Sequence, residues 1–192
     1  MRWLLGVAVV VLIAAAGVAY LVIDPFGDES DPSEALHLSG TACERLAGLA
    51  DHLAETDDSV NAFLLDLGQQ AAGISKGRRA LADLARGGRN RIPGRGFKGR
   101  FDDGSIGQVR HFVGYVRASM FGGTAVTQWI GEHLRRDPAG SPDGRLGDEG
   151  IDFAQKLVGG RLEPSDASSW LREHLCRRPV PLTSGQQTNA TD

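Results

Sequence analysis

The sequence predicts an all-α protein in which an N-terminal membrane segment precedes a helical domain. Apolar residues recur at every third or fourth position in several stretches of the domain, as they do along one face of a helix. Capping residues and glycines mark where these stretches begin and end. β-Branched residues, which favour strands, are sparse after residue 23. We therefore expect a bundle of about five to seven helices over residues 34–178.

Residues 3–23 form the first expected element, and they carry no charged side chain. As a helix rising about 1.5 Å per residue they would span roughly 30 Å, which matches the hydrocarbon core of a bilayer. We expect an uncleaved transmembrane anchor, because the apolar run continues as far as Ile23. The alternative is a signal peptide cleaved after Ala19, where small residues suit a signal peptidase.

Charge sets the expected orientation of this segment. Arg2 precedes it, whereas residues 24–33 form an acidic linker that contains Asp24, Asp28 and Glu29. Basic flanks stay in the cytoplasm, so the domain is expected to lie outside it, at the cell membrane. Cleavage of the segment would instead release a secreted protein. The richness in alanine, glycine and arginine points to a bacterial source.

Two long helices are expected in the first half of the domain. A capping-box pattern at residues 31–34 predicts a helix that ends near Glu55. Asp57 or Asp58 can cap a second helix that continues to about Ile74. A short third helix is expected to follow it.

Glycine divides the second half of the domain. Residues 87–104 are glycine-rich and are predicted to form an exposed loop. Ser105 opens a capping box for a helix over 105–121, which the glycine pair at 122–123 is expected to interrupt. Later helices are expected over 124–136, 148–159 and 166–177, with a loop at 137–147. The tail 179–192 is predicted to be disordered.

Two stretches repeat one pattern: WIGEHLRRDP at 129–138 and WLREHLCRRP at 170–179. In each copy Trp and His lie four residues apart on one helix face, and basic residues and proline follow where a helix would end. We interpret both as helix ends with a buried tryptophan. The alternatives are a distant duplication of a helical hairpin and a paired metal site at His133 and His174. Adjacent Glu and His point about 100° apart and cannot chelate one ion together, so no metal site is predicted.

The sequence contains two cysteines, Cys43 and Cys176, one near each end of the domain. In an oxidising compartment such a pair is expected to form a disulfide. Two buried free thiols are the alternative. No sequence motif for a nucleotide, a catalytic metal or a redox cofactor occurs in the chain, and no cofactor is predicted.

His111 is the first candidate for chemistry. It falls opposite the apolar stripe of its helix, together with Gly107, Gly114 and Ala118, and small residues at this spacing let a second helix approach closely. We favour a hydrogen-bonded core histidine that orients two helices. The alternative is a catalytic base with an aspartate partner. The candidate partners are Asp102, Asp103, Asp148 and Asp152.

Residues 86–100 carry the strongest surface signal, in which cations alternate with glycine, Ile92 and Phe97. The predicted binding residues are Arg86, Arg89, Arg91, Arg95, Lys98 and Arg100. Such a segment suits nucleic acid, anionic lipid or an acidic polymer, and the expected compartment disfavours nucleic acid. The alternative is pairing with the chain's own acidic helix. Residues 24–66 carry eleven acidic side chains and one basic, whereas residues 76–100 carry nine basic and one acidic.

These features predict a binding or scaffolding module of the bacterial cell envelope. It would contact the bilayer through residues 3–23, and anionic lipid or an acidic envelope polymer through the basic loop. One alternative is a small envelope hydrolase or secreted effector that uses His111 and an aspartate. Another is a processed, freely secreted domain that uses the basic loop as its contact surface.

Overall fold

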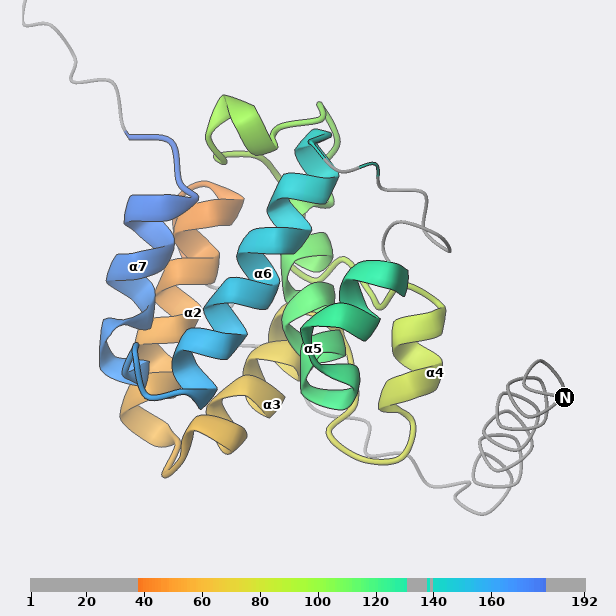
Figure 1. Cartoon of the computed structure of the whole chain (residues 1–192). Helices are drawn as coiled ribbons and strands as arrows, with labels where there is room; N and C mark the ends of the chain where they lie inside the picture. The colour runs from red at the N-terminus through yellow and green to blue at the C-terminus, as the bar shows by residue number, and fades with distance from the viewer. Residues whose placement is uncertain (1–37, 131–137, 139, 179–192) are drawn as a thin grey trace, which may run out of the picture.

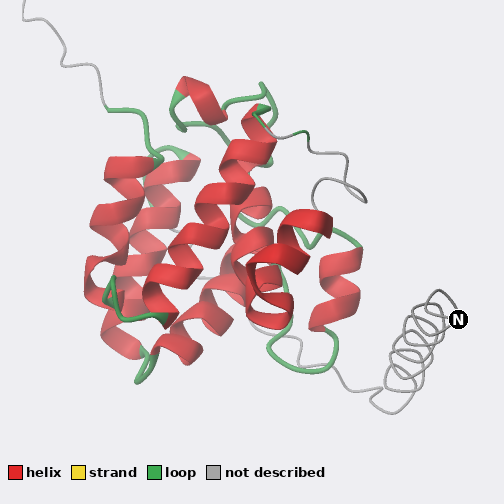
Figure 2. Cartoon of the chain, in the orientation of Figure 1, coloured by secondary structure: helices red, strands yellow, loops and turns green. Residues whose placement is uncertain are grey.

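The described residues fold into helices joined by loops, as the computed structural model shows for residues 38–130, 138 and 140–178 (Figures 1 and 2). The predicted all-α class is confirmed for this part of the chain, which contains no strand. The α-helices are α2 (Ala42–Thr56), α3 (Val60–Ala72), α4 (Ala80–Ala85), α5 (Gln108–Ile130), α6 (Pro142–Val158) and α7 (Ala167–His174). Two short 3-10 helices, η2 (Gly99–Phe101) and η4 (Pro164–Asp166), lie between them.

No helix within the described part of the chain is both long enough and apolar enough to cross a membrane. The predicted anchor at 3–23, the acidic linker at 24–33 and the tail at 179–192 lie outside the described residues. Their predicted roles stay predictions.

Helix α2 begins later than the sequence pattern suggests. Residues 38–41 are not helical, so the predicted continuous helix from residue 34 to Glu55 is wrong in this part. The start is set by Thr41, whose hydroxyl accepts a hydrogen bond from the backbone N–H of Glu44 at 3.3 Å. Gly40 has a φ of 101°, a conformation that favours glycine, and it turns the chain just before this cap. Threonine followed three residues later by glutamate is itself a capping pattern.

Helices α3 and α6 also start from serine caps. Ser59 caps α3 in place of Asp57 or Asp58, and its hydroxyl accepts from Ala62 N–H at 3.2 Å. Ser141 caps α6 and accepts from Gly144 N–H at 3.0 Å, so much of the predicted loop at 137–147 is helical from Pro142 onward. Proline is well suited to this first helical position, because its missing N–H would be unpaired there anyway.

Helix α5 differs from prediction at both ends. It begins at Gln108, because the Ser105 hydroxyl accepts from Gly107 N–H in a turn rather than capping the helix at residue 105. The expected interruption at 122–123 is wrong, since α5 continues to Ile130. Each glycine inside a helix costs only about 1 kcal/mol, which tertiary packing can offset.

Helix α6 packs closely against the His111 side of α5. Two glycines of α6 contribute to this contact: a Cβ at Gly147 would come 2.9 Å from the Tyr115 ring, and one at Gly150 would come 2.7 Å from the Phe112 carbonyl oxygen. An aromatic row then continues across the bundle. Phe153 of α6 lies 5.6 Å from Phe112 and 5.1 Å from Trp170 of α7, measured between ring centroids.

Cys43 and Cys176 form a disulfide across a sequence separation of 133 residues. It joins α2 to the chain that follows α7, and these two helices lie side by side in Figure 1. Residues 94–98 lie against this junction. Ala42 N–H donates to Arg95 O at 2.8 Å, Lys98 N–H to Leu175 O at 2.8 Å, and Arg177 N–H to Gly96 O at 2.7 Å. We call the disulfide together with these three hydrogen bonds the clasp.

We expect Gly150→Ala to lower the free energy of unfolding by about 1–3 kcal/mol, because the new methyl group meets the Phe112 backbone, which cannot move aside cheaply. Urea unfolding followed by circular dichroism would measure this. Gly77→Ala is the matched control, since a Cβ there meets no atom within 4 Å. Equal stability of the two variants would contradict the close α5–α6 contact.

Candidate functional site

The basic segment at 86–100 is a folded part of the domain. The prediction of a fully exposed loop is wrong for Ile92 and Phe97, which are 0% and 1% exposed and pack in the core. Phe97 forms an isolated bridge with Cys176. Gly96 has φ of 118°, and a Cβ there would lie 2.3 Å from the Thr41 hydroxyl oxygen, so glycine is required. The backbone of the segment therefore has a fixed path.

The cations at the C-terminal end of this segment bind other parts of the protein. The Arg95 guanidinium donates to Gly104 O at 2.8 Å, and the Lys98 ammonium donates to Glu173 O. Arg100 pairs with Glu149 at 3.2 Å and lies 4.5 Å from the centre of the Phe101 ring. These three predicted binding residues hold the local structure together.

The cations at the other end face solvent. Arg86 and Arg89 are exposed and Arg91 is partly exposed, and their side chains pair with no group in the described part of the chain. Arg78 and Arg79 are exposed immediately before α4. We call these five residues the arginine surface. Of the six predicted binding residues, only Arg86, Arg89 and Arg91 belong to it.

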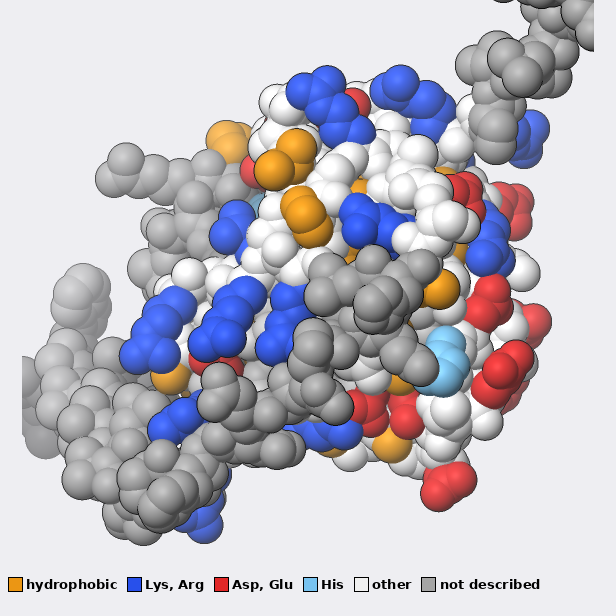
Figure 3. Space-filling view, turned by 180° about the vertical axis from the view of Figure 1, so that it is seen from behind, with side chains coloured by type: hydrophobic (Ala, Val, Ile, Leu, Met, Phe, Trp, Pro, Cys, Tyr) orange, Lys and Arg blue, Asp and Glu red, His pale blue; other side chains and the backbone are white. Residues whose placement is uncertain are grey.

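Acidic side chains gather on one side of the face seen in Figure 3. Most Asp and Glu on this face lie toward the side that carries α2, whereas Lys and Arg lie over the side that carries α4 and also along the top. The acidic residues of α2 pair with α7: Arg172 lies 3.3 Å from Glu44 and 3.1 Å from Asp51. The alternative of self-pairing is met in the described residues by the ion pair between Lys76 and Asp66 of α3, whereas the ion pairs of α2 go to α7.

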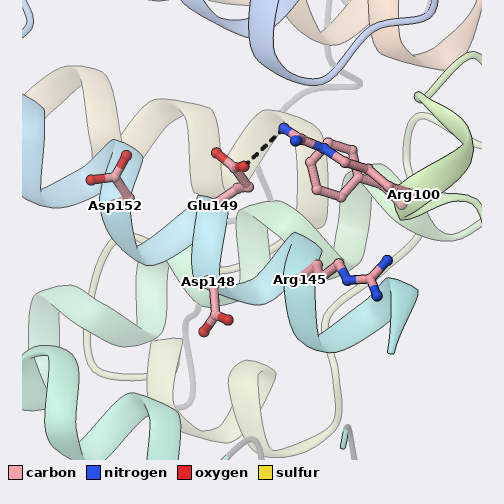
Figure 4. Close-up of a pocket in the computed structure, with 6 residues that line it drawn as sticks. Arg100, Arg145, Asp148, Glu149 and Asp152 are labelled. Atoms are coloured by element: carbon pink, nitrogen blue, oxygen red, sulfur yellow. Dashed lines mark hydrogen bonds and ion pairs between the residues drawn. The ribbon is translucent and has the colours of Figure 1, made fainter. Parts of the chain in front are cut away.

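An open groove of about 390 Å³ lies between η2 and α6 (Figure 4). It is lined by Arg100, Phe101, Arg145, Asp148, Glu149 and Asp152. The Arg100–Glu149 ion pair bridges it, and Asp152 pairs with Lys156 one helical turn away. Both signs of charge are present and largely neutralise each other, so the groove has no strong preference for an anion or a cation.

His111 lies where α5 meets the start of α6. Its Nε2 atom is 3.0 Å from the Asp143 carbonyl oxygen, and its ring centroid is 5.0 Å from that of Tyr115. Asp152 is nine residues farther along α6 than Asp143, or about 13 Å at the helical rise. The structure therefore does not bring Asp152 to His111.

Asp103 is the predicted partner that does lie near His111. Partial burial alone would raise the pKa of the Asp103 carboxyl, but hydrogen bonds from the Ser105 backbone and hydroxyl, with the nearby His111 ring, lower the pKa overall. The carboxylate also accepts from the Gln108 amide. Ser105 N–H and the Gln108 side chain thus hold Asp103 in a local turn.

Sequence reasoning missed Arg117, which is 1% exposed on α5. Its guanidinium donates to the Met120 sulfur at 2.9 Å and to Ser75 O at 3.3 Å, while its Nε has no hydrogen-bond partner among the described residues. Burial lowers the pKa of Arg117. Gly68 of α3 makes room for it, because a Cβ there would lie 2.2 Å from the Arg117 Cδ. Arg117 follows Val113 by four residues and so lies on the apolar side of its helix. This position in the sequence pattern could have predicted that Arg117 is buried.

The second copy of the repeated pattern lies at the end of α7. Trp170 is 8% exposed, and the His174 ring stacks on it with centroids 4.4 Å apart. His174 Nδ1 also lies 3.0 Å from Trp170 O, as expected for a side chain at a helix end. His133 lies outside the described residues. Within the described residues, no group of three or more His, Cys, Asp or Glu side chains could hold a metal ion.

Comparison with known proteins gives no assignment: no family model matches the chain, and no curated protein or solved structure shows significant similarity to it.

Two carboxyl groups make opposite contributions to the pH dependence of stability. The Asp103 charge stabilises the fold above an unfolded pKa of about 3.9, and this contribution is lost as pH falls through the lowered folded pKa. For Asp57, burial and the neighbouring Asp66 carboxylate raise the pKa. Its charge therefore destabilises the fold at neutral pH, and that cost disappears as the group becomes protonated.

We expect Asp57→Asn to raise the urea midpoint at pH 7, and Asp103→Asn to lower it. Both changes in the urea midpoint should shrink as the pH falls. The change caused by Asp57→Asn should vanish at a higher pH than the change caused by Asp103→Asn, because the pKa of Asp57 is raised in the folded state and that of Asp103 is lowered. Urea titrations between pH 7 and pH 2.5 would measure this. The assignment of the two environments fails if both variants change stability in the same direction at pH 7.

Proposed function

We propose that this protein is a membrane-tethered, extracytoplasmic binding module of a bacterial cell envelope, which binds anionic groups at its arginine surface. The observation that carries the proposal is the state of Arg86 and Arg89. Both are exposed on a backbone of fixed path, and neither is neutralised by a carboxylate of the described residues. Cations held this way keep their attraction for an external anion.

The charge distribution supports a local site over a general electrostatic attraction. The whole chain has a net charge of −3, so an acidic partner would be repelled by the protein as a whole. The arginine surface is attractive only because the chain separates its charges, with nine basic and one acidic residue in 76–100. Binding should therefore have a preferred orientation.

The disulfide and the predicted anchor support the proposed compartment. Disulfides persist in oxidising surroundings outside the cytoplasm, and Cys43 and Cys176 are bonded. Residues 3–23 would hold the domain beside the membrane. In that setting anionic lipid headgroups and acidic envelope polymers are the expected partners, and nucleic acid is disfavoured.

The alternative of a hydrolase that uses His111 has one nearby carboxylate, Asp103, which is held in a turn by Ser105 and Gln108. The His111 ring is occupied by the Asp143 carbonyl and the Tyr115 ring. The groove described above is lined by other residues. In the proposed function His111 positions α6 on α5.

We expect Arg86→Glu/Arg89→Glu to weaken binding to linear polyphosphate and to vesicles containing phosphatidylglycerol by at least about tenfold near 0.1 M salt, since each cation at an anionic surface contributes about 1 kcal/mol. Detergent-solubilised full-length protein would be used for the polymer, and flotation for the vesicles. Wild-type binding should disappear by a few hundred millimolar salt, as the screening length falls.

The matched control is Arg161→Glu/Arg178→Glu, which makes the same charge change at exposed arginines outside the arginine surface. This variant should bind nearly as well as the wild type. Equal loss in the two variants would show that net charge alone decides binding, and the proposed site would then be wrong. Failure of the wild type to bind either anion would reject the function itself.

A further inference from the structure

We infer that the α4 face of the arginine surface docks the domain on an anionic bilayer, with Leu81 inserted among the lipids. The inference rests on the proposed function and names its partner: of the two anion sources, a lipid surface and an acidic polymer, it selects the lipid surface.

The exposed side of α4 combines cations with an apolar side chain. Leu81 is 58% exposed. Arg79 and Arg86 occupy the two caps of the helix, and Arg78 is exposed in the turn that leads into it. A short turn with an apolar side chain between arginines has the composition of segments that lie at the interface of an anionic membrane.

The acidic residue of this segment faces inward. Asp83 is the sole acidic residue between 76 and 100. Its carboxylate accepts from the Ser75 backbone N–H at 3.0 Å and from the Ser75 hydroxyl at 2.6 Å. These bonds attach α4 to the turn after α3 and leave its outer face without a negative charge of its own.

Leu81 distinguishes the two anion sources. A hydrated polymer offers the arginines its charges but gives an exposed leucine no apolar surroundings. A bilayer interface satisfies both, because headgroups attract the arginines and acyl chains remove Leu81 from water.

The length of chain before the domain allows this docking. Fourteen residues, 24–37, separate the end of the predicted anchor from the first described residue. Fully extended, they reach up to about 50 Å, which is enough for any face of a domain of this size to reach the membrane. Tethering also keeps the effective concentration of the surface high, so weak contacts suffice. The separation of charges then selects the α4 face and turns the acidic half away.

The test places a fluorescent reporter at the docking residue of the full-length protein in liposomes. Leu81→Trp is compared with Val158→Trp, whose site is also apolar and 69% exposed but lies at the C-terminal end of α6. The emission of wild-type protein, which contains three tryptophans, is subtracted from both. We expect lipids brominated near the interface to quench Trp at position 81 by at least about twofold in phosphatidylglycerol vesicles, and to leave position 158 nearly unaffected.

Quenching at position 81 should disappear in purely zwitterionic vesicles, and also when Arg86→Glu/Arg89→Glu is added. Equal quenching at both positions, or none at position 81, would overturn the docking inference. If polyphosphate binding persists while position 81 is not quenched, the inference fails and the proposed function stands with a polymer as partner. If polyphosphate and vesicle binding are both absent, the proposed function fails as well.

Discussion

The clasp joins the two ends of the domain and fixes the path of the basic segment between them. The disulfide between Cys43 and Cys176 closes a loop of 133 residues, which by the loop-closure model stabilises the fold by about 5 kcal/mol. The three hydrogen bonds beside it attach residues 94–98 to the start of α2 and the end of α7. Because Phe97 is buried at this junction, the glycine-rich segment follows one path, and its arginines occupy defined positions.

The same arrangement explains why the two ends of the basic segment differ. Near the clasp, Arg95, Lys98 and Arg100 meet carbonyl and carboxylate oxygens of neighbouring elements. Farther from it, the chain passes beside α4, where the described elements offer Arg86 and Arg89 no carboxylate. A continuous run of cations in the sequence thus becomes a structural part and a surface part. Only the surface part is available to a partner.

Sequence patterns predicted the helical class and the cysteine pair, because both depend on local spacing and on residue chemistry. Helix starts were less predictable. The N-caps of α2 and α3 are Thr41 and Ser59, whereas the sequence pattern favoured acidic residues before them. Which of several possible caps begins a helix depends on tertiary contacts. Glycines have different roles in this fold. The pair at 122–123 lies within a helix that the sequence predicted to be interrupted there, and Gly147 and Gly150 lie where α6 packs against α5. No local pattern distinguishes these uses.

The candidate site shows the same limit. The sequence indicated a candidate binding surface in the basic segment, but it did not show that Ile92 and Phe97 pack in the core or that Arg117 is buried. Burial of a charge depends on its neighbours in space. Here they are Gly68, which provides room, and Ser75 and Met120, which accept hydrogen bonds. Gly68 and Ser75 are far from Arg117 in the sequence, so no local pattern reveals these two contacts.

Hydrogen exchange of three backbone amides shows whether the clasp fixes the basic segment in the fold. The amides are those of Ala42, Lys98 and Arg177, which donate the hydrogen bonds of the clasp. In the oxidised full-length protein they should exchange slowly, and reduction of the disulfide should accelerate them at least about tenfold relative to amides in the middle of α5. Rapid exchange in the oxidised protein, or protection that survives reduction unchanged, would contradict the account.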